Sequence, residues 1–582
     1  MGKRASKPSP PPRKAVAERA PASSNPTPAR PSDPDVAALR ELVVELIRDG
    51  DPEQAIGAVD ALLRLIEKLK DENNRQALKL ARMLRERYGK RSEKLDPGQL
   101  SLFMASVSAE DRGAEEGLEG KPGEGAAEPD TLRLELEALR EIKKKKRPDR
   151  KRTGRNPLPE NLPRETVRVE VAVEKRCCDA CGREKAVIGI ERSEMLEYVP
   201  AQLKVLVIER EKRACRACGD GVVTAPAADR VVDGGRPGPG LLAHLTVAKY
   251  LDHQPIHRLA RRFEHLGAAI PASTLGSWVT AVADACEPLY KRLCHKALHA
   301  HVLGVDATGL KILDKNHPAG VRKGSLWAYV GYDDTGQPRQ AVFDFTPDAC
   351  AYGPLGFLAE RKGLVQSDGS NLLAPLFKGP APPCVDIGCH MHFRRYFKEA
   401  LDAQDLRAAV PLEWLQKLYT VEALARERGA TAAERLALRQ EHAAPLMDAL
   451  HAWMAKMVPR VEPKTPLGQA LTYGINQWAS LNVFLTDGAI PIDNGEVERR
   501  IRPLALGRRN WLFVASDAGG HRAAILYSLI ASCTLAGVAP EPWLRDVLTR
   551  LSQGWPAKRV DELLPEHWKA LQEPSLPAAH AA

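Results

Sequence analysis

The chain has 582 residues, which is too long for a single hydrophobic core, so several domains are expected. Its formal net charge of +10 favours a polyanionic partner. The longest nearly apolar run, residues 525–539, is shorter than a bilayer span and contains hydroxyl side chains, so it predicts a buried helix and argues against a membrane protein. No N-terminal stretch resembles a signal peptide, and we expect a cytoplasmic protein.

The N-terminal part is expected to contain a basic tail and an α-helical coiled coil. Residues 1–34 are polar and hold nine prolines, a composition typical of disorder. Within residues 35–103, apolar residues recur at alternating spacings of four and three, the rhythm of a coiled-coil seam. The seam runs from Leu62 to Met83 and includes Asn73, a polar residue of the kind that sets register and oligomer state. This pattern favours self-association; the alternative is one amphipathic helix packed on its own chain.

Residues 104–155 are predicted to be a charged linker whose sign reverses along its length. Positions 110–130 carry eight acids and two bases, whereas positions 141–155 carry nine bases and two acids. Such a run can simply be solvated, but in a basic protein it favours a flexible arm that binds DNA phosphates. The predicted contacts of this arm are Lys143, Lys144, Lys145, Lys146 and Arg147.

Two C-x-x-C pairs predict a small β-rich module that binds zinc, over residues 156–232. Two thiolates three positions apart occupy neighbouring corners of a zinc tetrahedron, and a second pair completes it. The expected ligands are Cys178, Cys181, Cys215 and Cys218, with 33 residues between the pairs. Four thiolates leave no open position, so the one Zn²⁺ would be structural. The alternatives are four reduced cysteines without metal, or Cys177 in place of Cys178 as a ligand.

Residues 233–297 have the pattern of short helices. A break at Gly267 and a last helix capped by Ser or Thr in "IPASTLGSW" are typical of a helix-turn-helix segment. Many three-helix units share this pattern, so DNA contact and plain packing both stay open for this segment.

From His301 onward the sequence predicts an α/β core with the ribonuclease-H-like fold. Three strand-like runs with turn signals between them are followed by a helix and by two short strands that alternate with helices. In that fold, an aspartate on the first strand and one after the fourth strand meet at the centre of the sheet, and a later helix supplies a third carboxylate; Asp306 and Asp368 stand at the first two places here. The expected boundaries are 298–391 for the first part of the core, 392–485 for an all-helical insertion, 486–555 for the C-terminal part of the core and 556–582 for a tail.

The stretch "PIDNGEVERRIRPLALGRRNWLF", residues 491–513, resembles the C-terminal signature of transposases of the bacterial insertion sequence sixty-six family. The chain departs from that signature at Gly495, where the family has Asn. Other blocks are similar as well, among them "RSEKLDPGQLSLF", "KYLDHQPIHR", "LVQSDGS" and "GCHMHFRRYF". The resemblance covers residues 40–555 and implies a catalytic core of the DDE type.

The resemblance also implies the catalytic residues. Carried over by position, the triad falls on Asp306, Asp368 and Glu498. Hydrolysis of a phosphodiester needs an activated water and a stabilised leaving oxygen, and two Mg²⁺ or Mn²⁺ ions held by carboxylates serve both ends. Glu496 competes for the third place, but two residues apart on a helix the side chains point about 200° apart, and the family position selects Glu498. The chain departs from the family at Ala307 and Met391, where many members have Glu and Ala.

Basic and aromatic residues of the same stretch are expected to contact DNA or to pack. The predicted phosphate contacts are Arg499, Arg502, Arg508 and Arg509. Trp511 could stack on a base or pack, and packing is favoured because residues 511–516 are also typical of a strand. Two cysteines and two histidines could indicate a second zinc site, but their irregular spacing favours core cysteines and a histidine near the triad. These four are Cys384, Cys389, His390 and His392, with His392 and Asn494 expected near the site.

The expected function is that of a multidomain transposase. It would bind the terminal inverted repeats of its element as double-stranded DNA, cleave the ends with two divalent ions and transfer the 3′ ends to target DNA. Self-association and companion proteins of the same element are the expected partners, in the bacterial nucleoid and without a membrane. Two alternatives stay open: a metal-dependent nuclease of the same fold that never joins strands, and a zinc-containing DNA-binding regulator with a dead core. The three carboxylates argue against the regulator.

Overall fold

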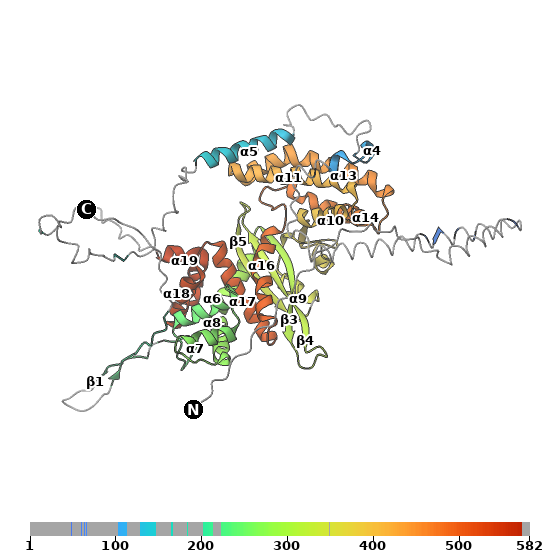
Figure 1. The fold of residues 1–582 in the computed structure, drawn as a ribbon. Helices are drawn as coiled ribbons and strands as arrows, with labels where there is room; N and C mark the ends of the chain where they lie inside the picture. Colours follow the sequence, from blue (N-terminus) through green and yellow to red (C-terminus); the bar gives the residue numbers. More distant parts are fainter. Residues whose placement is uncertain are drawn as a thin grey trace. The chain divides into compact units, whose positions relative to one another are not determined.

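The computed structural model describes residues 103–112, 129–146, 202–213, 223–227, 229–348 and 350–572, together with isolated positions (Figure 1). The chain divides into two compact units, residues 1–89 and 90–582, and every element given below belongs to the second. In the described part of the chain, no helix is long and apolar enough to cross a membrane. The predicted N-terminal tail, nearly all of the predicted coiled-coil seam, the four predicted zinc ligands and Arg147 lie outside the described residues, whereas the predicted C-terminal tail is described up to Gln572.

A mixed sheet of five strands organises the second unit. Its order is β5-β4-β3-β6-β7, in which β3, β4 and β5 are antiparallel neighbours while β6 and β7 run parallel to β3. The strands are β3 (Val302–Leu313), β4 (Val321–Tyr332), β5 (Pro338–Thr346), β6 (Gly363–Gln366) and β7 (Cys384–Ile387). The predicted succession of three antiparallel strands followed by parallel strands is confirmed.

The sheet is covered on both faces. In β4 all residues from Ser325 to Tyr332 are buried, as expected of a strand with helices on either side. Helices α8 (Ala272–Leu298) and α16 (Gly495–Trp511) both pack on it, α8 against β4 and β5, and α16 against β3 and β4 (Figure 1). Gly304 allows the close approach of α16, because a Cβ there would lie 2.8 Å from Val497 and 2.9 Å from the Asn494 side-chain oxygen.

The open edge of β5 is closed by α17 (Asp517–Leu535). The Ser528 hydroxyl accepts a hydrogen bond from the Phe343 amide at 2.8 Å, and the Ser532 hydroxyl donates one to the Ala341 carbonyl at 3.1 Å. These bonds satisfy edge groups that would otherwise be open to strand addition. The buried helix predicted over residues 525–539 is therefore confirmed up to Leu535, where α17 ends.

Three helices precede the sheet: α6 (Pro239–Tyr250), α7 (Ile256–His265) and α8. The predicted break at Gly267 is present, with φ at +88°. The predicted Ser or Thr cap is wrong, because Pro271 occupies the N-cap of α8 and no side chain caps that helix. Ser273 therefore lies inside the first turn, past the position from which a hydroxyl caps the first amides. These helices share one hydrophobic cluster with the sheet and with α17 and α18 (Pro540–Ser552).

The segment between β7 and α16 is helical. Its helices are α10 (His390–Asp402), α11 (Ala409–Arg428), α12 (Ala432–Leu438), a π-helical turn (Arg439–Ala443), α13 (Ala444–Met457), α14 (Pro466–Asn476) and α15 (Trp478–Asn482). We call residues 392–485 the insertion. The remaining helices and strands are α4 (Ala109–Arg112), α5 (Pro129–Lys146), β1 (Lys212–Arg213), β2 (Val223–Thr224), α9 (Tyr352–Phe357) and α19 (Pro565–Gln572). Short 3₁₀ turns join some of these elements, among them η6 (Val483–Leu485) and η7 (Ala557–Leu563).

The expectation of a flexible basic arm over residues 141–155 is wrong for its first part. Residues 141–146 complete α5, which packs against α11 of the insertion (Figure 1). Leu132 and Leu136 of α5 are buried against a cluster that includes Leu424. Lys143, a predicted DNA contact, instead lies 2.9 Å from the carboxylate of Glu427. Packing of Leu132 and Leu136 against α11 thus places residues 141–146 next to the insertion.

Candidate active site

Three carboxylates reach the same region from three elements. Asp306 lies within β3, and Asp368 follows the end of β6 by two residues. The parallel register pairs Gly304 with Gln366, so both aspartates lie two residues beyond a paired position of neighbouring strands. Glu498 is in the first turn of α16, the helix that packs on β3. The fold therefore brings together side chains that are up to 192 residues apart (498 minus 306).

The electrostatics of Asp306 reflect this grouping. The pKa of Asp306 is raised from 3.8 to about 6, mainly by burial and also by the negative charges of Asp368 and Glu498. A hydrogen bond from the Ala307 amide, 2.7 Å long, and the positive charge of Arg395 act in the opposite direction. A cation bound among these three partly buried acids would offset the repulsion between their negative charges.

Two basic side chains of α10 lie beside Glu498. The Nε2 of His392 is 3.7 Å from Glu498 Oε1, and a terminal nitrogen of Arg395 is 3.5 Å from the same oxygen. The structure thus places His392 next to the third carboxylate. Arg395 was not among the predicted site residues, although it lies three positions after His392 in "HMHFRRYF", a spacing that puts both on one face of a helix.

Glu496 takes a different position from Glu498. Its two oxygens accept hydrogen bonds from Arg499 Nε at 2.7 Å and from Arg500 Nε at 2.9 Å. Of the two glutamates, it is Glu498 whose charge acts on Asp306. Glu496 is therefore engaged in ion pairs along α16.

The start of α16 is tied to the strand that carries Asp306. Asn494 is fully buried; its side-chain amide donates to the Val305 carbonyl at 2.8 Å, and its backbone N–H donates to Cys389 Sγ at 3.3 Å. His390 Nδ1 lies 3.0 Å from the Ile492 carbonyl, and burial lowers the pKa of this imidazole to about 4, so it is neutral at pH 7. Asn494 thus lies next to the strand that carries Asp306, while Cys389 and His390 pack behind it.

Within the described ranges, no three His, Cys, Asp or Glu side chains are gathered at metal-ligand spacing. The three carboxylates act on one another electrostatically but are not drawn together as ligands of an ion would be. Their oxygens are the hard donors that Mg²⁺ and Mn²⁺ prefer, and the excess negative charge at Asp306 favours a divalent ion. The residues present therefore fit divalent ions.

The predicted phosphate contacts fall into two groups. Arg499 pairs with Glu496, and Arg508 donates to the Gly309 carbonyl on β3. Arg502 and Arg509 are exposed and make no hydrogen bond or ion pair within the part of the chain that the structure describes. At 100° per residue, both point within about 40° of Glu498 around the axis of α16. The helix thus presents two unpaired arginines along the face that carries the third carboxylate.

Trp511 packs, but the strand predicted over residues 511–516 is wrong. Trp511 is the last residue of α16 and is half-buried against the core, with the Lys249 ammonium 5.9 Å from its ring centre. Val514 makes only an isolated bridge to Ile312 on β3. The side chains of Lys144, Lys145 and Lys146 are outside what the structure describes.

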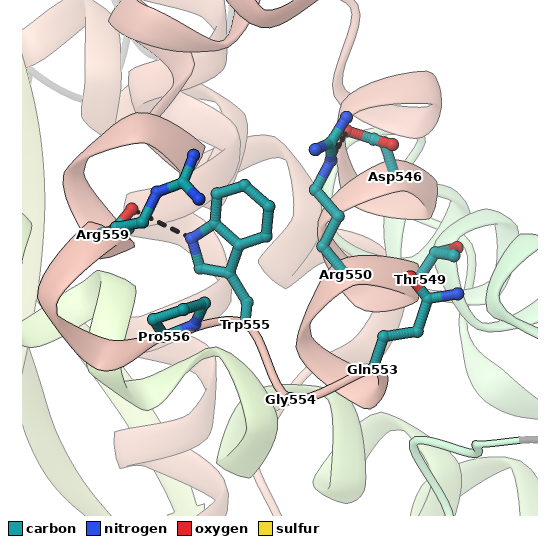
Figure 2. A pocket seen from close by; sticks show the side chains of 8 residues that line it. All are labelled: Asp546, Thr549, Arg550, Gln553, Gly554, Trp555, Pro556 and Arg559. Carbon is teal, nitrogen blue, oxygen red and sulfur yellow. Dashed lines mark hydrogen bonds and ion pairs between the residues drawn. The ribbon is translucent and has the colours of Figure 1, made fainter.

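A pocket of about 430 Å³ lies between α18 and η7, away from the three carboxylates, none of which lines it (Figure 2). The guanidinium carbons of Arg550 and Arg559 lie 5.2 and 4.6 Å from the ring centre of Trp555. Each arginine is already paired with a carboxylate, Arg550 with Asp546 and Arg559 with Glu562. The charges of these pairs cancel, so the pocket is explained by the packing of the turn that joins α18 to η7.

Comparison with known families defines the class of protein. A family model described as "Transposase IS66 family" matches residues 234–522, which hold the sheet, the insertion and all three carboxylates. Further models match residues 75–167 ("Transposase C of IS166 homeodomain"), 175–219 ("zinc-finger binding domain of transposase IS66") and 528–565 ("IS66 C-terminal element"). The chain therefore has the layout of a transposase with a zinc-finger module and a catalytic domain.

Curated relatives cover most of the chain. The uncharacterized protein y4jD of Sinorhizobium fredii is 34% identical over 425 residues, which are 71% of this chain and 82% of the relative. From the same organism, y4hP is 31% identical over 436 residues (72% and 78%), and y4qI is 29% identical over 551 residues (92% and 97%). The chain belongs to the IS66 transposase family.

Proposed function

We propose that this transposase has a ribonuclease-H-like core of the DDE type, in which Asp306, Asp368 and Glu498 hold two Mg²⁺ or Mn²⁺ ions. The observation that carries the proposal is the convergence of the three acids from β3, β6 and α16, with Asp368 and Glu498 both raising the pKa of Asp306. When bound, the ions would activate the attacking oxygen and stabilise the leaving oxygen of a phosphodiester. The three carboxylates of the chain would supply the negative charge and the oxygen ligands for these ions.

The residues around the acids suit a DNA strand at this site. Arg502 and Arg509 continue from Glu498 along one face of α16 and would neutralise successive phosphates. Arg395 partly balances the charge of Glu498, and His392 lies beside the same carboxylate oxygen. Glu496 keeps Arg499 and Arg500 in place on the other side of the helix. The substrate of the proposed reaction is double-stranded DNA, first the terminal inverted repeats of the element and then the target.

The test of this proposal is a cleavage and joining assay. Purified protein is incubated with labelled DNA that carries one end of the element, an unlabelled target and Mg²⁺. We expect nicked ends and, after them, labelled target molecules that contain the joined strand. Cleavage without joined product would favour a nuclease, and binding without cleavage would favour a regulator with a dead core.

The range matched by the zinc-finger model contains the two C-x-x-C pairs, and we propose that they hold one structural Zn²⁺. Protein purified without chelator should contain one zinc per chain by elemental analysis. Cys215→Ser should lose this zinc because three thiolates leave the tetrahedron incomplete. The control Cys350→Ser, which alters an exposed free cysteine, should keep it. Zinc-free wild-type protein, or a Cys215→Ser variant with unchanged zinc content, would contradict the proposal.

Further proposals concern assembly and additional contacts to DNA. The seam from Leu62 to Met83 would join chains, because the two ends of an element have to be handled together. Companion proteins of the same element would assist, and the complex would act on the bacterial nucleoid. The basic residues Lys143, Lys144, Lys145, Lys146 and Arg147 would add contacts to DNA, with Lys143 exchanging Glu427 for a phosphate.

A further inference from the structure

A buried arginine of the insertion uses every donor it has. Arg439 has no exposed surface, and all five N–H groups of its guanidinium find acceptors. Two of them bind the carboxylate of Glu422, at 2.6 and 3.0 Å. The other three bind backbone carbonyls of Phe484, Asp487 and Ile490, at 2.8, 2.9 and 2.9 Å. A buried charge is tolerated only when it is paired and hydrogen-bonded in this way.

The carbonyls that Arg439 holds belong to the segment that leads into α16. The next residues of that segment, 491–494, are held one after another by other elements. Gln366 Nε2 donates to the Pro491 carbonyl at 2.8 Å, and the Tyr419 hydroxyl donates to Asp493 at 2.8 Å. Asn494 then bonds to β3 next to Asp306, and the Glu498 amide bonds to the Asn494 carbonyl at 3.2 Å. We call residues 484–494 the clamped segment.

We propose that Arg439 is a positioning residue for the third carboxylate. Through the clamped segment, the Glu422–Arg439 pair sets where α16 begins and therefore where Glu498 lies relative to Asp306. The inference rests on the proposed function of Glu498 as a metal-holding carboxylate. It assigns a task to the insertion: α11 and the π-helical turn supply the two charged residues that fix a loop of the catalytic domain.

The geometry explains why this residue is an arginine. Its planar fork reaches one carboxylate and three carbonyls at once, whereas a lysine ammonium has three donors on a single atom. Lysine would keep the charge opposite Glu422 but would leave carbonyls of the clamped segment without their donor. Arg439→Lys therefore loosens the clamped segment while it retains the ion pair.

The test compares Arg439→Lys with Leu450→Ala. Leu450 is buried in α13 of the same insertion, so its loss destabilises the insertion without removing a hydrogen bond to the clamped segment. Two quantities are measured in the full chain: amide hydrogen exchange over residues 484–500, and the Mg²⁺ concentration that gives half-maximal cleavage. We expect Arg439→Lys to speed exchange there about tenfold or more and to raise the half-maximal Mg²⁺ several-fold, with Leu450→Ala changing neither.

The outcomes separate positioning from plain stability. Equal changes in both variants at an equal loss of melting temperature would overturn the proposal, and so would unchanged exchange in Arg439→Lys. If Arg439→Lys does not fold, Glu422→Gln is used instead. This variant keeps the three hydrogen bonds from Arg439 to carbonyls, so amide exchange and half-maximal Mg²⁺ should shift in the same direction but by less. Unchanged values of both would again overturn the proposal. If the wild type shows no Mg²⁺-dependent cleavage, the proposed function fails, and the exchange comparison still decides whether Arg439 holds the clamped segment.

Discussion

Asp306→Asn, Asp368→Asn and Glu498→Gln should each reduce Mg²⁺-dependent cleavage at the element ends by about three orders of magnitude or more. Each change removes one negative charge from a site that would balance two divalent ions, so the ions would be weakly held and misplaced. DNA binding should persist within a few-fold, because affinity for DNA comes mainly from basic residues that neutralise phosphates. Cleavage rates and binding constants measured on the same preparations check both parts.

The amide variants are expected to fold. Burial and the two neighbouring acids make ionised Asp306 costly in the folded state, since they raise its pKa from 3.8 to about 6. A group whose folded pKa is raised penalises folding above that pKa, so replacing Asp306 by neutral Asn removes a penalty at pH 7. The melting temperature of ion-free Asp306→Asn should therefore equal or exceed that of the wild type. Lost cleavage in a well-folded variant then reports on the site itself.

Glu496→Gln is the matched control for Glu498→Gln. It lies two residues away on the same helix and removes the same charge, but its partners are Arg499 and Arg500. We expect it to keep most of the cleavage activity. If Glu496→Gln were inactive and Glu498→Gln active, the third carboxylate would be Glu496. If all three triad variants still cleaved, the DDE mechanism would be refuted.

The parts of the fold that the sequence predicted are those with strong local patterns. The alternation and turn signals between residues 301 and 387 predict the strand order, and with it the meeting of Asp306 and Asp368, because parallel neighbours end at the same edge. The place of Glu498 came from the resemblance to a family signature. Helix periodicity then explains why Glu496, two residues away, has other partners.

Other features depend on distant residues, and local patterns do not contain them. The basic run at residues 141–146 predicts a flexible arm because its charges outnumber its apolar residues, yet it completes α5, whose Leu132 and Leu136 are buried against Leu424, nearly 300 positions away. Arg439 is one among 85 lysines and arginines, and its role follows only from the carbonyls that the folded chain brings opposite it. Arg395 is similar, since its partner Glu498 is on another helix.

Replacing Arg502 and Arg509 should have a large effect on DNA binding. The double variant Arg502→Gln/Arg509→Gln should weaken binding to DNA by about 10- to 100-fold near 0.1 M salt, because two cations are removed from the face of α16 that carries Glu498. Each lost phosphate contact should flatten the plot of log affinity against log salt by about 0.9, so the slope should fall by about 1.8. Titrations at several salt concentrations measure both quantities.

The matched control is Lys362→Gln/Lys558→Gln, which removes the same net charge from exposed positions outside α16 that likewise make no hydrogen bond or ion pair in the described part of the chain. General attraction between a basic protein and DNA would weaken equally in both double variants, whereas a DNA path along α16 predicts that only the first loses the steep salt dependence. The half-maximal Mg²⁺ should stay unchanged in Arg502→Gln/Arg509→Gln once DNA is saturating, because neither arginine contacts a carboxylate in the described part of the chain. Equal losses in both double variants would place the DNA elsewhere on the protein and leave the two arginines of α16 as ordinary surface charges.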